Sequence, residues 1–458
     1  MDIALNNGHI LNIEGNVEKL NIGIDDGVIK KISSKYIDAK KQLNVEGLLI
    51  TPGFIDVHMD REGLINCKNS NCYEGKSLLR MGVTSAIGGN CGYNLYPLKN
   101  YKKNVMTKGV PQNVGVFVGY NTLRSNLEIG RYQKANTSQI NTIQKILRKS
   151  FKEGVFGLSV GLAFHPGISV KELLSVSRVV AEYDAYLSVQ LITERNNIIS
   201  SLKEIINISR ETGVRLQLSH IGSIAAYGHM NEFLTTLENA VDSGIQARGD
   251  CYPYSSFSTE ISSPFFDDGF ENRLNCKIED FQIAEGEYKG RRCDYDLFYK
   301  LRKEKPNTLI IAHVMDEEEV IEALKHPYIL IASDINLHKN EGHPRAVGTY
   351  PRFLGHYCRD KGILSMMCGL TKITSNPAYW YQFKNKGRII EGVPADLVVF
   401  DPNKIIDRST YIEPLTPPLG IKYTILNGYI VVEDSRVDHL NKGRWLNYHH
   451  KSNIISGY

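Results

Sequence analysis

The chain has 458 residues, of which 42% are hydrophobic, and its formal net charge at pH 7 is only +4. This length fits one large α/β domain with an accessory domain, and the scattered charge argues against a nucleic-acid-binding surface. No apolar run is long enough to span a membrane, and the first residues lack the features of a signal peptide. We therefore expect a cytoplasmic protein without nucleic-acid or membrane partners.

The two ends of the chain are predicted to form one small β-sandwich. Residues 1–52 contain short strand-like runs, and the turn dipeptide Asp26-Gly27 separates two of them. Residues 385–458 show the same pattern with an Asn-Gly turn. Because chain termini often lie close together, a domain built from both ends is physically reasonable.

The middle of the chain, residues 53–384, alternates strand-like and helical patterns and predicts a TIM-like (β/α)8 barrel. Residues 262–300 break this alternation and are predicted to be an inserted loop or lid over the active face. The nine candidate strands are 53–58, 83–88, 113–118, 155–160, 186–191, 214–219, 245–250, 308–313 and 329–333. Since a barrel of this type has eight strands, we expect one of the last three to lie outside it.

Residues able to bind a metal or move a proton stand at the ends of several candidate strands. In a barrel these ends share one face, where catalytic groups gather. Each residue alone is more often structural, as a helix cap or a buried small side chain, but their joint placement favours a site. Imidazole, thiolate and carboxylate are ligands that suit zinc. The residues concerned are His58, Asp60, Cys91, His220, Asp250 and Asp334.

The eight cysteines are spread along the chain, which argues against a disulfide framework. Cys67 and Cys72 are the closest pair. We expect two free thiols there, with a pairing of the two as the alternative.

Several ordered stretches together resemble one known family. They are "PGFIDVH", "GGNCGYNLYPL", "GLSVGLAFHPG", "LQLSHIGS", "GDCYPYSSFST", "ASDINLHKNEGHPRAVGTY" and "KGRIIEGVPADLVVFDP". The sequence resembles the amidohydrolase superfamily, and within it most closely the N-acyl-D-amino-acid deacylases (D-aminoacylases), over nearly the whole chain. The resemblance implies a barrel with a small β-sandwich. It also implies zinc-dependent hydrolysis of a small-molecule N-acyl-D-amino acid to a carboxylate and a D-amino acid.

The resemblance also implies roles for individual residues. His58 matches the first histidine of the His-x-His on the first strand, and Cys91 and His220 match zinc ligands. Asp334 matches the aspartate that acts as general base and then as general acid.

The substrate side of the predicted site is implied in the same way. Arg345 matches an arginine that holds the substrate carboxylate, a task that suits its planar fork. Tyr252 and Ser258 match further substrate-contacting positions.

The sequence departs from the family pattern at the metal site. Asp60 stands where the second histidine of His-x-His is expected, and Gln190 stands where a zinc-binding histidine ends the fifth strand. Phe164 replaces a tyrosine. Carboxylate can replace imidazole at zinc, but glutamine is a neutral and weak ligand, so these changes predict weakened zinc binding. The candidate metal ligands are Cys91, His220, His58, Asp60 and Gln190.

Three functions therefore stand at this point. The leading one is a metal-dependent deacylase of N-acyl-D-amino acids. The second is a catalytically impaired homologue that binds such molecules, and the third is a hydrolase of cyclic amides. A compensating ligand is conceivable at a nearby histidine, and the sequence offers five: His165, His229, His313, His338 and His343.

Overall fold

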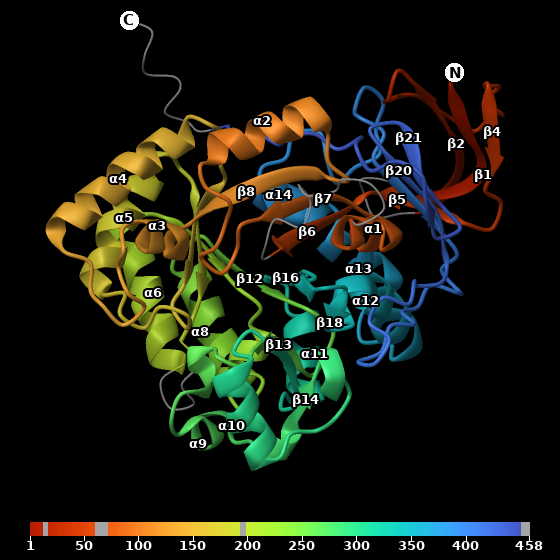
Figure 1. The fold of residues 1–458 in the computed structure, drawn as a ribbon. Coiled ribbons are helices and arrows are strands. Elements are labelled where there is room, and N and C mark those ends of the chain that lie inside the picture. The colour runs from red at the N-terminus through yellow and green to blue at the C-terminus, as the bar shows by residue number, and fades with distance from the viewer. Residues whose placement is uncertain (12–16, 60–71, 193–197, 450–458) are drawn as a thin grey trace, which may run out of the picture.

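The computed structural model describes residues 1–11, 17–59, 72–192 and 198–449 (Figure 1). Asp60 and Cys67 lie outside these residues. Cys72 is disulfide-bonded, so the expectation of a free thiol at this position is wrong. Among the described residues, no helix is long and apolar enough to cross a membrane.

Eight parallel strands form the predicted barrel, and the fold class is confirmed. Each strand hydrogen-bonds to its neighbours in the order given below. The barrel closes between its first and last members, where the main-chain N–H of Asp334 donates to the carbonyl of His58 over 3.0 Å. The strands are β16 (Ile329–Ile331), β12 (Ala247–Cys251), β11 (Arg215–Leu218), β10 (Tyr186–Gln190), β9 (Gly157–Gly161), β8 (Asn113–Gly119), β7 (Val83–Gly88) and β6 (Phe54–Met59).

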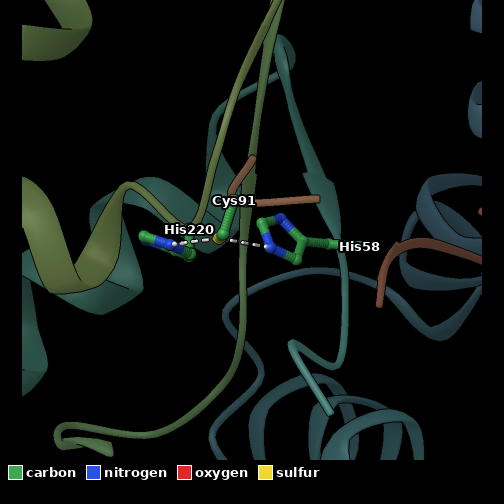
Figure 2. Close-up of side chains that lie close together, drawn as sticks. All are labelled: His58, Cys91 and His220. Atoms are coloured by element: carbon green, nitrogen blue, oxygen red, sulfur yellow. Dashed lines mark hydrogen bonds between the residues drawn. The ribbon is translucent and has the colours of Figure 1, made fainter. Parts of the chain in front are cut away.

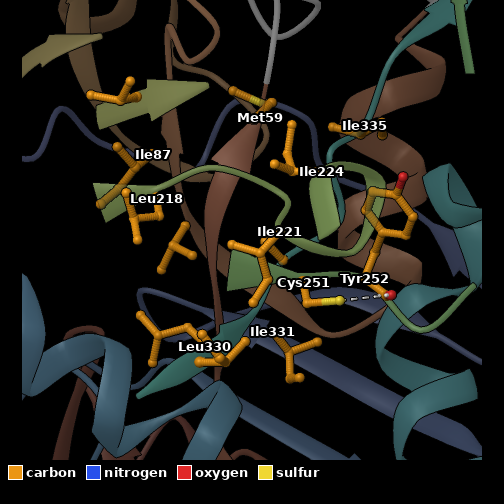
Figure 3. Close-up of a cluster of buried hydrophobic side chains, with 14 of the residues drawn as sticks. Met59, Ile87, Leu218, Ile221, Ile224, Cys251, Tyr252, Leu330, Ile331 and Ile335 are labelled. Atoms are coloured by element: carbon orange, nitrogen blue, oxygen red, sulfur yellow. Dashed lines mark hydrogen bonds between the residues drawn. The ribbon is translucent and has the colours of Figure 1, made fainter. Parts of the chain in front are cut away.

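Burial on both faces explains why these strands read as continuous apolar runs. Every residue of β6, β7 and β8 is buried, as expected for parallel strands covered by helices. Figure 3 shows apolar side chains of the barrel meeting in the core, among them Met59, Ile87 and Leu218. This packing fixes the strand ends that carry the chemistry.

Helices wrap the outside of the barrel (Figure 1). Helix α5 is preceded by its N-cap residue Ser169, whose side chain and that of Glu172 form a reciprocal capping box. The helices are α1 (Tyr73–Arg80), α2 (Leu98–Lys108), α3 (Tyr120–Asn126), α4 (Thr137–Phe151), α5 (Val170–Glu182), α6 (Ile198–Thr212), α7 (Gly222–Ala225), α8 (Met230–Asp242), α11 (Glu317–Lys325), α12 (Arg345–Arg352), α13 (Met366–Ile373) and α14 (Ser375–Trp380).

One of the last three candidate strands, 308–313, lies outside the barrel, as expected. It is β15 (Leu309–Ala312), which pairs antiparallel with β13 (Phe257–Glu260) and with β14 (Phe281–Ile283). Helices α9 (Phe270–Leu274) and α10 (Tyr295–Glu304) belong to the same region. A short hairpin, β17 (Leu337–His338) and β18 (Glu341–Gly342), follows β16.

Strands from both chain ends share one sheet, which confirms the accessory β domain. The two predicted turns lie against each other, since an added Cβ on Gly428 would approach the Cα of Gly27 to 2.3 Å. Both turns have two successive positive φ angles, which Asp-Gly and Asn-Gly adopt readily. The strands run in the order β22 (Arg436–Val437), β21 (Tyr429–Glu433), β20 (Ile421–Leu426), β19 (Leu397–Phe400), β5 (Leu49–Pro52), β1 (Ile3–Leu11), β2 (Val17–Asp25) and β3 (Val28–Ser33), with β4 (Lys41–Asn44) also paired to β1.

Candidate metal centre and pocket

Three predicted ligands meet at the carboxyl ends of barrel strands. His58 lies on β6, while Cys91 and His220 follow β7 and β11. Their ligand atoms lie within 4.8 Å of one another, and all three side chains are buried. The Cys91 Sγ lies between the imidazoles, 3.4 Å from the Nε2 of each (Figure 2). Two imidazoles and a thiolate form a donor set that suits zinc.

Asp250 orients His58. Its Oδ1 lies 3.1 Å from Nδ1 of His58 and also accepts the main-chain N–H of His220 at 2.8 Å. Gln217 Nε2 donates to the other carboxylate oxygen at 2.8 Å. Burial raises the pKa of Asp250, but the two histidines and these hydrogen bonds outweigh it, so the net pKa is lowered. The resulting carboxylate accepts the Nδ1 proton and leaves the Nε2 lone pair of His58 directed at Cys91.

Ser223 does the same for His220. Its Oγ lies 2.8 Å from Nδ1 of His220 and donates to the carbonyl of the same residue at 2.9 Å. Since the single hydroxyl proton goes to the carbonyl, Nδ1 must donate to Oγ. The Nε2 of His220 is then an acceptor that also faces Cys91.

The backbone at these strand ends is unusual. Cys91, His220 and Asp334 have φ angles of 53°, 32° and 48°, a region that non-glycine residues seldom adopt. In the "GGNCG" stretch, Gly92 has φ of 84°, and an added Cβ would approach the side-chain oxygen of Asn121 to 2.2 Å. Such conformations persist only where the surroundings enforce them, and they cluster at functional sites.

Asp334 and Arg345 form a buried pair beside the three ligands. Asp334 Oδ1 lies 3.6 Å from Nε2 of His58, and Oδ2 lies 2.8 Å from Nη2 of Arg345. Arg345 Nε also donates to the Asp334 carbonyl at 2.8 Å. The guanidinium stacks over the ring of Tyr252 at 4.6 Å from its centroid. The structure thus places Tyr252 against Arg345, and two of the arginine's donors on Asp334.

One pocket contains most of the predicted site. It has about 880 Å³ of empty space, part of it open to solvent, and Cys91, His220, Asp334, Arg345 and Ser258 are in its wall. The structure therefore brings these predicted residues together.

Gln190, at the end of β10, lines the same pocket. Its side chain is only 3% exposed, and in the part of the chain that the structure describes its Oε1 has no hydrogen-bond partner. A buried acceptor without a donor calls for an ion, a water or a substrate N–H group.

The five histidines considered as compensating ligands lie elsewhere, since the group found among the described residues contains none of them. His165 is the one nearest in sequence to the pocket residue Phe164. Burial, followed by the charges of Arg124 and Arg131, lowers the pKa of His165 to about 4. His338 Nδ1 lies 2.6 Å from Oε2 of Glu285, within hydrogen-bonding distance.

Sequence reasoning missed two positioning residues. Asp250 was noticed as a strand-end acid, but no role followed from its place. The sequence gives no sign of the role of Ser223 other than its position three residues after His220. The hydroxyl of Ser223 reaches the imidazole of His220 only because a helical turn, α7, begins there.

Comparisons with known proteins agree with this geometry. No protein-family model matches the chain. The D-aminoacylase of Alcaligenes xylosoxydans xylosoxydans is 26% identical over 440 residues, which cover 89% of each protein. A solved D-aminoacylase structure, described for its binuclear metal centre, has a TM-score of 0.87 at 25% identity and covers 97% of this chain and 99% of its own.

A further solved structure shows the same fold. It is an N-acyl-D-glutamate deacylase from Bordetella bronchiseptica complexed with zinc and a phosphonate mimic of the tetrahedral intermediate. Its TM-score is 0.86 at 24% identity, and the match covers 98% of this chain and 99% of that one. The resemblance inferred from the sequence motifs is confirmed by these comparisons.

Proposed function

We propose that this protein, which resembles the N-acyl-D-amino-acid deacylases over nearly its whole length, is a metal-dependent amide hydrolase. Its proposed reaction converts an N-acyl-D-amino acid and water into a carboxylate and a free D-amino acid. The observation that carries the proposal is the meeting of Cys91 with His58 and His220 beside a pocket that Cys91, His220 and Asp334 line.

The residues present fit a zinc ion. His58 and His220 each direct Nε2 at the Cys91 Sγ, and neighbouring groups fix both imidazoles in that orientation. Three protein ligands are typical of catalytic zinc sites, whereas structural sites have four. A bound zinc would polarise the substrate carbonyl and promote ionisation of water. We propose Gln190 and Asp60 as further candidate ligands, and the buried, unpartnered Oε1 of Gln190 supports the former.

Asp334 is the proposed general base and acid. Its carboxylate lies next to His58 at the pocket, and Arg345 contacts Asp334 twice, once at the carboxylate and once at the main-chain carbonyl. Asp334 would take a proton from the attacking water and return it to the nitrogen of the departing amine. Fixing a base in this way reduces the loss of orientational freedom in the transition state.

Substrate binding is proposed at Ser258 and Arg345, which line the pocket, with the ring face of Tyr252 packed against the guanidinium of Arg345.

We also propose a division of the chain into two domains. Residues 1–52 and 385–458 form the β domain, and residues 53–384 form the barrel, with 262–300 as an insertion. The membership of the strands in separate sheets supports this division. The proposed location is the cytoplasm, and six free cysteines among the described residues support it, although the disulfide-bonded Cys72 does not.

The test combines metal content with turnover. Purified protein should contain about one zinc per chain by elemental analysis and release D-amino acid from a panel of N-acetyl-D-amino acids. Asp334→Asn should abolish turnover while retaining zinc. The matched control is Asp316→Asn, because Asp316 is exposed and caps α11, and asparagine caps a helix equally well.

Two other results would redirect the assignment. Ligand-induced stabilisation without turnover on any member of the panel would favour the binding-protein alternative. Turnover confined to hydantoins and lactams would replace the deacylase by a cyclic-amide hydrolase.

A further inference from the structure

Four charged side chains line the pocket, and one of them has no counter-charge. Asp334 and Arg345 pair with each other at 2.8 Å. Glu260 and Arg131 also line the pocket, but among the described residues no ion pair or side-chain hydrogen bond engages Arg131. Arg131 is exposed, so its guanidinium stands at the solvent side of the pocket.

The segment that carries Arg131 is held on both sides by buried groups. The side chain of Arg124 is fully buried, and its Nη2 donates to the carbonyl of Gly130 at 3.1 Å and to that of Gln133. Glu172, also fully buried, pairs with Arg124 and accepts the main-chain N–H of Ala135 at 3.3 Å.

The carbonyl of Arg131 itself is hydrogen-bonded, since it accepts the N–H of Gly167 at 2.8 Å. The contact is close, because an added Cβ on Gly167 would approach the carbonyl carbon of Tyr132 to 2.3 Å. Three main-chain groups between residues 130 and 135 hydrogen-bond to this buried pair, in addition to the N–H of Ser169. The backbone at Arg131 is therefore fixed in position over the pocket.

Aromatic rings line the same pocket as Arg131. The ring of Phe164 lies 5.8 Å from that of Tyr93 and 6.0 Å from that of Phe265, and Phe257 lies 5.9 Å from Phe265. All four residues line the pocket. Rings of this kind exclude water from a bound molecule and strengthen a charge pair at its edge.

We propose that Arg131 pairs with a carboxylate of the N-acyl-D-amino acid at the solvent side of the pocket. The proposal rests on the proposed function and names a specificity residue for it. Arginine can bind both oxygens of a carboxylate at once. The carboxylate could be the α-carboxylate of any such substrate or the second carboxylate of an acidic side chain, and the substrates below distinguish the two.

The experiment compares Arg131→Gln with Lys134→Gln. Lys134 is exposed in the same segment and is outside the pocket wall, so it controls for the loss of one positive charge nearby. Each variant and the parent chain are assayed on N-acetyl-D-glutamate, N-acetyl-D-glutamine and N-acetyl-D-leucine. Unfolding midpoints show whether each variant is folded.

Two results support the proposal. A KM raised about fivefold or more for N-acetyl-D-glutamate alone, with kcat little changed, assigns Arg131 to the side-chain carboxylate. A similar rise for all three substrates assigns it to the α-carboxylate. In both cases Lys134→Gln should leave KM near the parent value.

Two results overturn it. The first is a KM of Arg131→Gln that equals the parent value on all three substrates. The second is a change in KM that Lys134→Gln shows to the same extent. If the chain turns over none of these molecules, the proposed function fails first, and the same comparison is made on dissociation constants from ligand-induced thermal shifts. Weaker binding in Arg131→Gln than in Lys134→Gln then supports the anion site, and equal binding removes it.

Discussion

At the scale of single residues, the site depends on which nitrogen of each histidine carries the proton. Asp250 and Ser223 set this for His58 and His220, so that two lone pairs and one sulfur converge. Partners of this kind affect metal affinity almost as strongly as the ligands themselves. Neither partner belongs to the group of three candidate ligands, which is why residue types alone did not reveal their roles.

Asp250→Asn should weaken zinc binding about 10- to 100-fold. Asparagine can still accept the main-chain N–H of His220, but its neutral amide no longer holds the Nδ1 proton of His58. Chelator competition measures the zinc dissociation constant. Exposed Asp242→Asn is the control, and equal zinc affinity in both variants would show that Asp250 does not orient His58.

Gln190→Met should stabilise the metal-free protein by about 1 kcal/mol, because it removes a buried acceptor without a partner. The matched control is Gln217→Met. Gln217 is equally buried but accepts from Trp380 Nε1 at 2.9 Å and donates to Asp250, so its replacement should be destabilising. Urea unfolding of both metal-free variants tests the contrast. Destabilisation in both would show that Gln190 has a partner in solution.

His165 should make stability pH-dependent in the acid range. Its pKa is lowered to about 4 by burial and by two arginines, against 6.5 as the ordinary value. Between these values the unfolded chain binds more protons, so this residue lowers stability as pH falls from about 6.5 to 4. His165→Gln should therefore lose less stability than the parent between pH 7 and 5, by on the order of 1–2 kcal/mol. Urea unfolding at several pH values measures the difference, with exposed His439→Gln as the control for the loss of a histidine side chain.

At the scale of elements, the sequence predicted the strands well, since buried parallel strands leave continuous apolar runs. The sequence could not show whether residues 308–313 or residues 329–333 form the last barrel strand, because both are short apolar runs. The choice depends on pairing, which places β15 between β13 and β14. Arg131 was missed for a similar reason. It stands in a segment between α3 and α4 whose position depends on Arg124 and Glu172 rather than on any local pattern.

The Arg124–Glu172 pair should be far more important for stability than an exposed pair of the same type. Arg124→Met leaves a fully buried carboxylate without its partner and should destabilise the fold by about 3–5 kcal/mol. The control is Arg148→Met, which breaks the half-exposed pair with Glu182 at 2.8 Å and should cost less than about 1 kcal/mol. Urea midpoints give both values. Similar losses of unfolding free energy in both variants would mean that the buried pair stabilises the fold no more than the exposed pair does.

At the scale of the whole molecule, the proposed metal joins distant parts of the barrel. Its three candidate ligands come from β6 and from the segments after β7 and β11. An ion that binds only the folded chain stabilises it according to its concentration and affinity. Removing the metal should therefore lower the unfolding temperature, and added zinc should restore it. In calorimetry, Cys91→Ala should melt at one temperature with or without zinc, whereas a zinc-dependent shift in that variant would place the ion elsewhere.

The shared sheet has a consequence for the order of events during synthesis. Strand β5 pairs on one side with β1 and on the other with β19, where Ile50 lies opposite Val399. A ribosome must therefore translate about seven-eighths of the chain before the earliest strands can complete their sheet. Contacts this far apart in sequence form slowly. Nascent chains that end before β19 should expose the apolar side chains of β1 and β5 and require chaperones, whereas the complete chain buries them.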